Sequence, residues 1–482
     1  MTVWRRRRFR LFWTGDTISA AGGALSTVAL PLLAIETLHA SDAAVGMVRA
    51  AQTLPFLLLA IPIGLLADRI SRRRLLLAAD AVRFPLVALI ALLGAALGVP
   101  GLVALVFVVG IATVGYEVGY LSALPELVDD PAELPHANRA VETAHAGASL
   151  LGPAAAGALL TAITPTGVIA IDALTFATGA ALTAINRWDR TPSPSLSSSP
   201  QPAPASSSDP PARQSSDRPS SDLSSAQPSG SRRAAPSDLS SAQRSGSRRG
   251  APSDLSSAQR SDSRRAAPSG PSSPRLGGPA LLAGWTWLWH DPYVRPMTLY
   301  LAANNIAAQA FQTALLLFVV RTLGLSAAAL GLAVAAAGGG FLTGAMISPP
   351  LARRLGTGRV VISASLIGAL GIAVVAAAPP NAGYLLVLLG AALSGAGPGL
   401  LNLHSIAVRQ AITPPALLGR VNAVVKTISY GSTTLGALTG GLAAAAAGPR
   451  VVIATAAVVS ALATAILATS AVRTLTTAPA SA

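Results

Sequence analysis

Long apolar runs, separated by short polar or Gly/Pro-rich breaks, flank a polar central segment of the chain. Runs of about 20 residues are long enough to cross a ~30 Å hydrocarbon core as helices. They are too long and continuous for barrel strands, and only helices or closed barrels satisfy backbone polar groups in lipid. The pattern therefore predicts an all-α integral membrane protein. The twelve predicted spans are 11–37, 43–67, 75–97, 101–127, 138–163, 166–187, 296–322, 327–351, 359–378, 381–410, 418–446 and 450–472.

The central segment, residues 188–284, is rich in Ser, Pro, Ala and Arg. It contains a sixteen-residue tandem repeat, which runs over Ser221–Pro236, Ser237–Pro252 and Ser253–Pro268. Because it has too few apolar residues to form a core, we expect a disordered linker between two six-helix bundles, 1–187 and 285–482. Its 12 Arg against 7 Asp could contact anionic lipid head groups, but a low-complexity spacer is the simpler interpretation.

Composition narrows the class of protein further. The chain is 51% hydrophobic and 11% charged, whereas a soluble domain carries roughly a quarter charged residues. It contains no Cys, which excludes disulfides and thiol nucleophiles, and its five His residues lack metal-ligand spacing, so neither a metal nor a cofactor is expected. The net charge of +15 falls in loops and in the linker, which argues against nucleic-acid binding.

Basic residues indicate the orientation in the membrane. The loops on one side hold Arg5–Arg8, Arg69, Arg72–Arg74, Arg139, Arg353, Arg354, Arg359 and Arg420. The other loops have only Arg49, Arg321 and Arg450, each at a span boundary. We therefore expect a multi-pass protein of the cell membrane with both termini and the linker in the cytoplasm. The run 11–37 is too long for a signal peptide, so we interpret it as an uncleaved first helix.

Residues 64–74 read Gly-Leu-Leu-Ala-Asp-Arg-Ile-Ser-Arg-Arg-Arg between two spans. This loop resembles the signature between the second and third helices of the major facilitator superfamily, with Ser71 where Gly is usual. The resemblance covers nearly the whole chain except the linker, and it implies the major facilitator fold with alternating access. Four further segments resemble the branch of enterobactin exporters and macrolide efflux pumps: Ala29–Leu33, Leu124–Val128, Ile171–Phe176 and Gly419–Val421.

The resemblance assigns a conformational latch to this loop. Its Asp68 would act as the latch and could face the positive N-terminus of the eleventh helix near Leu418. Arg72 and Arg73 could pair with Glu126 or Asp129 at the end of the fourth helix. The alternative is that the Arg cluster only sets topology. The latch residues are thus Gly64, Asp68, Arg69, Arg72, Arg73 and Glu126.

The corresponding loop of the second half, Gly344–Gly356, has no acidic residue, and no Asp or Glu follows Asp291. A carboxylate that couples transport to protons must therefore come from the first half. Acids inside a bilayer are costly and are functional candidates by default. We favour Glu117, which lies near the middle of the fourth span; the alternative is a structural hydrogen bond between helices. The other coupling candidates are Asp16, Asp172 and Glu142, whereas Asp80 has Arg83 at i+3 and predicts a local ion pair.

A polar face on the seventh span predicts a substrate site. Asn305, Gln309 and Gln312 lie at i, i+4 and i+7 and so share one helical face. Such amides suit a polar-decorated organic molecule, although a single amide could instead join two helices. The further substrate-site candidates are Tyr116, Tyr120, Asn402, Lys426 and Tyr430, with His404 as either a packed or a reactive residue.

These features predict a proton-coupled exporter of an amphipathic small molecule such as a drug, secondary metabolite or siderophore. The segment Gly147–Gly157 resembles an exporter motif of the fifth helix. Expected partners are the substrate, protons and membrane lipids, and we expect a monomer. The alternatives are an importer or lipid transporter and a non-transporting sensor or scaffold. An enzyme is not expected, because no nucleophile-base set is present.

Overall fold

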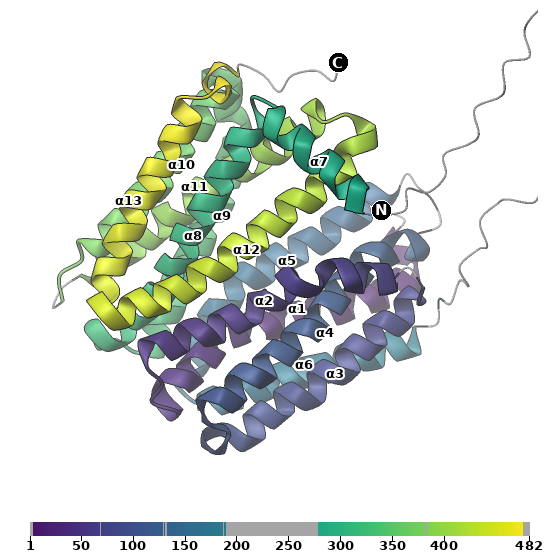
Figure 1. Cartoon of the computed structure of the whole chain (residues 1–482). Coiled ribbons are helices and arrows are strands. Elements are labelled where there is room, and N and C mark those ends of the chain that lie inside the picture. Colours follow the sequence, from purple (N-terminus) through teal and green to yellow (C-terminus); the bar gives the residue numbers. More distant parts are fainter. Residues whose placement is uncertain are drawn as a thin grey trace, which may run out of the picture. The chain divides into compact units, whose positions relative to one another are not determined.

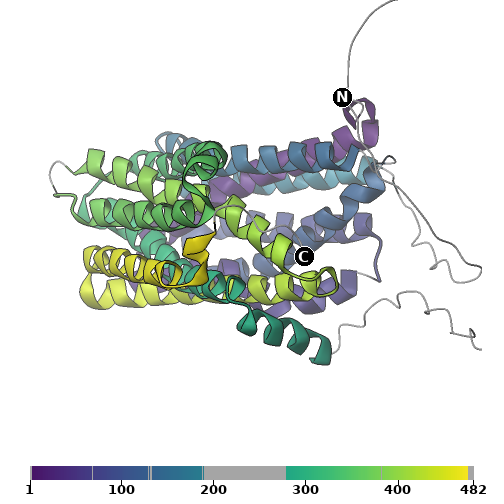
Figure 2. The same ribbon diagram turned by 90° about the horizontal axis from the view of Figure 1, so that it is seen from above.

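The computed structural model describes residues 3–67, 69–128, 130, 133–186, 188, 278–380 and 383–475. Every described residue belongs to one compact unit, which falls within Met1–Ser193 and Arg275–Ala482. Its helices form one group from residues 7–185 and another from residues 278–468 (Figure 1, Figure 2). We treat the groups as the N-terminal and C-terminal halves.

Among its described residues, the N-terminal half contains six long helices. They are α1 (Arg7–Leu32, continued by a π-helical turn over Leu33–Thr37), α2 (Asp42–Ala67), α3 (Arg72–Leu93), α4 (Gly98–Leu127), α5 (Leu134–Leu159) and α6 (Pro165–Ile185). Asn186 at the end of α6 donates from its amide to the carbonyl of Arg8, 2.8 Å away. The start of α1 and the end of α6 therefore lie on one side, which we call the predicted cytoplasmic side; the opposite side is the predicted external side.

From residue 278 to residue 475, the described part of the C-terminal half contains one short and six long α-helices. They are α7 (Gly278–His290), α8 (Val294–Leu317, continued by a π-helical turn over Phe318–Thr322), α9 (Ala327–Leu355), α10 (Thr357–Ala376), α11 (Tyr384–Ile412), α12 (Pro415–Ala447) and α13 (Pro449–Ala468). In both halves the first long helix ends in a π-helical turn, as expected for two related bundles.

The long helices follow the predicted spans closely. Within the described residues, nine helical segments are long and apolar enough to cross a membrane. One of them, Arg72–Tyr120, contains α3 and most of α4, whereas α5 and α12 are not among the nine. The fold is therefore an all-helical one with many membrane-spanning elements, and a count of twelve crossings stays a prediction.

Helix α7 begins at Gly278, inside the range 188–284 that the sequence assigns to the linker. It packs against α12 and α8 (Figure 1), and its Leu288 is fully buried. Trp285 and Trp289 lie one turn apart, with ring centroids separated by 5.4 Å. The residues Gly278–His290 thus form a short helix of their own before the first span of the second half.

Glycines bring the two halves together near the predicted external side. A side chain at Gly46 of α2 would place its Cβ 2.7 Å from the Cα of Gly441 on α12. A Cβ at Gly157 of α5 would come within 2.9 Å of the Cα of Gly331 on α9. Small residues let membrane helices approach closely, and at these two crossings a Cβ would clash with backbone atoms of the neighbouring helix. Since α2 and α9 occupy equivalent places in the two halves, the two crossings are related by the internal repeat.

Buried apolar residues also connect the two halves near the predicted external side rather than the predicted cytoplasmic side. One large cluster combines residues of both halves near the two π-helical turns, including Leu33 and Phe318. Clusters toward the predicted cytoplasmic side stay within one half, such as the one around Phe12 or the one around Met297. The halves are thus packed together most extensively at the predicted external side.

Candidate functional site

A cavity of about 390 Å³ lies among the helices of the N-terminal half. Its lining combines apolar side chains and the polar residues Thr27, Gln52 and Thr113 with a group of ionisable and hydroxyl-bearing side chains from α1, α3, α4, α5 and α6. This group comprises Asp16, Ser19, Ser26, Arg83, Tyr116, Glu117, Tyr120, His145 and Asp172. Charges inside a membrane protein are rare and cluster at functional sites, so the cavity is the first candidate site.

Asp16 joins three helices at this cavity. Its carboxylate accepts a hydrogen bond from the hydroxyl of Tyr116 on α4 at 3.0 Å. The Nε2 atom of His145 on α5 lies 2.8 Å from the other carboxylate oxygen. Asp16 is only 2% exposed, so these partners replace the water that a carboxylate needs. The arrangement fixes α1, α4 and α5 through one side chain.

Arg83 joins α3, α4 and α6. Its guanidinium donates to the carboxylate of Asp80 on the same helix, which confirms the ion pair that the i+3 spacing predicts. The same group lies 4.0 Å from the ring centroid of Tyr116 and 4.4 Å from that of Phe176 on α6. Cation–π contacts of this kind stabilise a desolvated guanidinium by about 2 kcal/mol or more. Arg83 is therefore held in place by α3, α4 and α6 together.

Asp172 on α6 is also occupied. It accepts hydrogen bonds from the hydroxyl groups of Ser26 on α1 and of Thr175, the latter at 3.3 Å. A Cβ at Gly22 of α1 would lie 2.6 Å from a carboxylate oxygen of Asp172. The glycine therefore leaves room for this acid at the crossing of α1 and α6.

Glu117 differs from these acids. It lines the cavity and is partly buried, yet it forms no hydrogen bond or ion pair with any residue that the structure describes. Its electrostatic partners are His145, Lys426, Arg83 and Asp16. Lys426 belongs to α12, so Glu117 interacts electrostatically with the opposite half.

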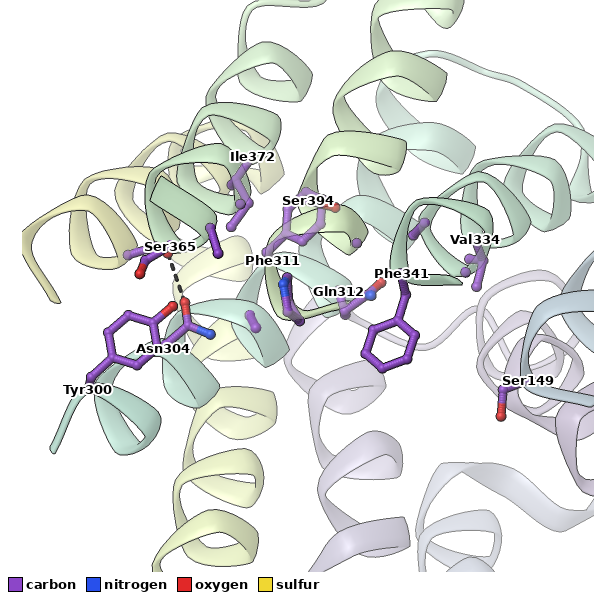
Figure 3. Close-up of a pocket in the computed structure, with 18 residues that line it drawn as sticks. Ser149, Tyr300, Asn304, Phe311, Gln312, Val334, Phe341, Ser365, Ile372 and Ser394 are labelled. Atoms are coloured by element: carbon purple, nitrogen blue, oxygen red, sulfur yellow. Dashed lines mark hydrogen bonds between the residues drawn. The ribbon is translucent and has the colours of Figure 1, made fainter. Parts of the chain in front are cut away.

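A second cavity, of about 300 Å³, lies in the C-terminal half (Figure 3). Its polar lining is neutral and comes mainly from α8, α10, α11 and α13, with Ser149 of α5 at the edge. Asn304 accepts a hydrogen bond from the hydroxyl of Ser460 at 2.8 Å. Gln312 and Phe341 also contribute to the lining. The two halves thus provide an acidic cavity and an uncharged one.

A third cavity, of about 170 Å³, lies between α1, α2, α8 and α9. It shares Thr27 with the N-terminal cavity and shares Gln312 and Val334 with the C-terminal one. Arg49 of α2 and Gln309 complete its polar lining. The three cavities therefore adjoin one another across the boundary between the halves.

The structure distributes the predicted amides of α8 over different environments. Gln309 and Gln312 line cavities, whereas Asn305 donates to the hydroxyl of Ser429 on α12 at 2.9 Å. Asn304, the neighbour of Asn305, takes the cavity position. The shared face of three amides is thus split between a cavity and an interhelical contact.

Four other sequence candidates lie on α11 and α12. Tyr430 stacks on Phe56 of α2 with ring centroids 4.7 Å apart. His404 lies 2.8 Å from the hydroxyl of Ser348, which corresponds to the packed alternative. Asn402 and Lys426 are exposed and do not line the three cavities. Tyr116 and Tyr120, by contrast, both line the N-terminal cavity, while Glu142 is exposed on α5.

The predicted latch can be followed in part. Asp68 lies outside the described residues. Arg73 donates to the carbonyls of Thr183, Ala184 and Asn186 and so caps the C-terminus of α6. Pairing of Arg72 or Arg73 with Glu126 stays a prediction. Arg69 is exposed, and Arg72 donates to the carbonyl of Ala67. At Gly64, an added Cβ would meet nothing within 4 Å outside its own helix, so no neighbour requires glycine there.

An ion pair joins the halves on the opposite side. Arg321, in the π-helical turn after α8, donates to the carboxylate of Asp42 at the start of α2 and to the carbonyl of Ala40. The sequence placed Arg321 only at a span boundary. Sequence reasoning also missed His145 and Arg49 as cavity residues. The available signal was that each is an ionisable residue inside a predicted membrane span, 43–67 for Arg49 and 138–163 for His145.

Two family models match the chain. The one described as "Transmembrane secretion effector" matches residues 1–200, and the one described as "Major Facilitator Superfamily" matches residues 297–481. No curated protein matches the sequence significantly.

Solved structures of transporters share the fold. The nucleoside transporter NupG has 12% sequence identity, a TM-score of 0.62, and coverage of 96% of this chain and 98% of its own. A bacterial homologue of the human lysosomal transporter Spinster has 14% identity, a TM-score of 0.60 and coverage of 96% of both chains. A bacterial homologue of the iron transporter ferroportin has 13% identity, a TM-score of 0.62, and coverage of 96% and 98%. Taken with the fold, the matches in both halves of the chain support a transporter of the major facilitator superfamily rather than an enzyme.

Proposed function

We propose that the protein is a secondary active transporter of the cell membrane that exports an amphipathic small molecule in exchange for protons. The observation that carries this proposal is Glu117. It is an acid in the cavity of the N-terminal half, and it has no partner among the described residues, whereas Asp16, Asp80 and Asp172 are each bound to neighbouring side chains.

An unpartnered carboxylate can take up and release a proton without breaking a structural contact. In the proposed cycle, Glu117 is protonated from the external side as the substrate leaves in the same direction. The halves then rearrange, and Glu117 returns its proton to the cytoplasm as the next substrate binds. Lys426 and His145 supply positive charge near the deprotonated form. No proton is created or lost in this exchange.

Asp16 with His145 is the second candidate for the proton route. The two side chains form a contact of 2.8 Å between α1 and α5, and both line the same cavity as Glu117. His is the side chain whose ordinary titration range includes neutral pH, which suits proton transfer. In this arrangement His145 would pass protons between Glu117 and Asp16, and Asp172 and Glu142 would have secondary roles.

The lining of the cavities supports an amphipathic substrate. Apolar residues dominate, and tyrosines, amides and hydroxyl groups are spread over both halves. Binding sites for drug-sized molecules have this composition and volumes of about 300–1,000 Å³. The cavities of about 390 and 300 Å³ each reach this range.

Export rather than uptake is supported by two observations. The family model that matches residues 1–200 is described as a secretion effector. The segment Gly147–Gly157, which resembles an exporter motif, uses Gly152 to approach Ala24 of α1 and Gly157 to approach Gly331 of α9. In the externally open state, Asp68 and its neighbours would hold the cytoplasmic side closed. Both termini would lie in the cytoplasm, and the protein would be a monomer.

Transport in everted membrane vesicles tests the proposal. In such vesicles the external side faces the lumen, so an exporter accumulates its substrate inside when the lumen is acidified. A panel of fluorescent amphipathic compounds should show accumulation that a protonophore abolishes. Accumulation only in right-side-out vesicles would identify an importer. A chain that moves no compound in either direction would contradict transport and favour the sensor or scaffold.

A further inference from the structure

Arg49 of α2 lies in the cavity of about 170 Å³ between the halves. The buried Nε atom of its guanidinium has no hydrogen-bond partner. Arg49 also forms no ion pair or hydrogen bond elsewhere with the residues that the structure describes. The other arginine that lines these three cavities is Arg83, and it is paired with Asp80.

An unpaired arginine at this place is expensive to keep. Its guanidinium cannot lose its proton in a protein, so the charge persists. The side chain as a whole is half-buried, but its Nε–H donor is shielded from solvent, and a buried donor without an acceptor costs about 1–3 kcal/mol. The arrangement is therefore incomplete without an acceptor, and a residue kept in this state inside a membrane protein indicates a ligand.

The chain itself offers no acid at this cavity. The C-terminal half has no Asp or Glu after Asp291, so α8 and α9 cannot supply one. Asp42, at the start of α2, is already bound to Arg321. The other polar residues of the lining are Thr27, Gln309 and Gln312. The hydroxyl of Thr27 and the amides of the two glutamines can donate hydrogen bonds. The rest of the lining is valine and leucine.

We propose that Arg49, Gln309 and Gln312 bind a carboxylate group of the transported molecule. One guanidinium matches a single negative charge, and its fork of N–H groups matches the two oxygens of a carboxylate. The cavity is smaller than a pocket for a whole ligand, so it holds one functional group while the apolar body of the molecule occupies an adjoining cavity. This inference rests on the proposed function, because it names the chemistry of the substrate.

Binding to the purified full-length protein in nanodiscs tests the inference without a proton gradient. The probes are 1-naphthylacetate and cholate, each beside its neutral amide, in chloride-free buffer. Affinity is followed by tryptophan fluorescence and by the thermal unfolding midpoint. The variant is Arg49→Gln, and the matched control is Arg359→Gln, which removes an exposed arginine at the start of α10.

We expect at least one acid to bind the unmodified protein and Arg359→Gln on the order of ten- to a hundred-fold more tightly than its amide. In Arg49→Gln the acid should bind no more tightly than the amide. Equal binding of acids and amides, absence of binding by both acids, or an unchanged preference in Arg49→Gln would each overturn the inference. Displacement of the acids by millimolar chloride, with chloride alone giving the same stabilisation, would also overturn it in favour of an inorganic ion.

The comparison of acid and amide on the unmodified protein needs no variant, so it remains decisive if Arg49→Gln does not fold. Its failure is also separate from a failure of proton coupling. Proton-driven export that shows no preference for acids contradicts only the role of Arg49. A preference for acids without proton-driven export contradicts only the proposed coupling.

Discussion

The guanidinium of Arg321 binds the carboxylate of Asp42 and thereby links the end of α8 to the start of α2. The pair lies beside the Gly46–Gly441 crossing and the apolar cluster that both halves share. It is a charged contact between the halves at the predicted external side, opposite the loop that carries the predicted latch. Opening of the external side requires this contact to break.

Removal of this ion pair should favour the externally open state. The side chains are 35% and 15% exposed, and a pair of this exposure contributes about 0.2–1 kcal/mol. Arg321→Gln should therefore shift the ratio of open to closed molecules by up to roughly five-fold. The chain has no cysteine, so spin labels at Ala162→Cys and Ala377→Cys, exposed positions in opposite halves, report the change. Arg353→Gln is the control. Identical distance distributions in the unmodified protein, Arg321→Gln and Arg353→Gln would show that the Arg321–Asp42 pair does not hold the external side closed.

The Asp80–Arg83 pair should matter more for stability than for external closure. Both side chains are buried, at 0% and 4% exposure. Removal of one partner leaves an uncompensated charge and should cost about 3–5 kcal/mol, whereas removal of both should cost less. Thermal unfolding in detergent should therefore rank Asp80→Ala as less stable than Asp80→Ala with Arg83→Met. The opposite ranking would mean that the stacking of Arg83 on Tyr116 and Phe176 is the larger contribution.

A side chain at the glycine crossing should separate the halves. In Gly46→Ala the new Cβ would meet the Cα of Gly441 at 2.7 Å and the carbonyl of Ala437 at 2.9 Å, and neither backbone atom can move independently. We expect reduced transport and the same lengthening of spin-label distances as in Arg321→Gln. The control is Gly419→Ala on α12, where a Cβ meets nothing within 4 Å. Wild-type transport by Gly46→Ala would show that the crossing tolerates expansion.

Deletion of residues 195–275 should leave transport largely intact, because this segment has too few apolar residues to form a core. Initial rates in everted vesicles, normalised to the amount of protein in the membrane, measure the effect. A complete loss of transport at normal protein levels would mean that the segment is more than a tether.

The sequence predicts the helices far better than the site. Apolar runs of membrane length give the spans directly, and the Asp80–Arg83 spacing gives a local pair. Helix α7 was missed because its apolar run is too short to span a membrane and follows a polar segment. His145, Arg49 and Arg321 were missed because their importance comes from contacts with distant helices, such as the 2.8 Å contact between His145 and Asp16. Helix periodicity places Asn305 beside Gln309, but it does not show that Asn305 contacts Ser429 instead of a cavity.

Proton-driven accumulation by Glu117→Gln in everted vesicles tests the central claim most directly. The glutamine keeps the size of the side chain but carries no exchangeable charge, so the cavity should still bind substrate. The control is Glu133→Gln, which removes a glutamate that pairs with Arg6 outside the cavity. We predict that Glu117→Gln loses at least nine-tenths of the accumulation driven by the pH gradient, while Glu133→Gln accumulates substrate like the unmodified protein. Undiminished accumulation by Glu117→Gln would contradict the account.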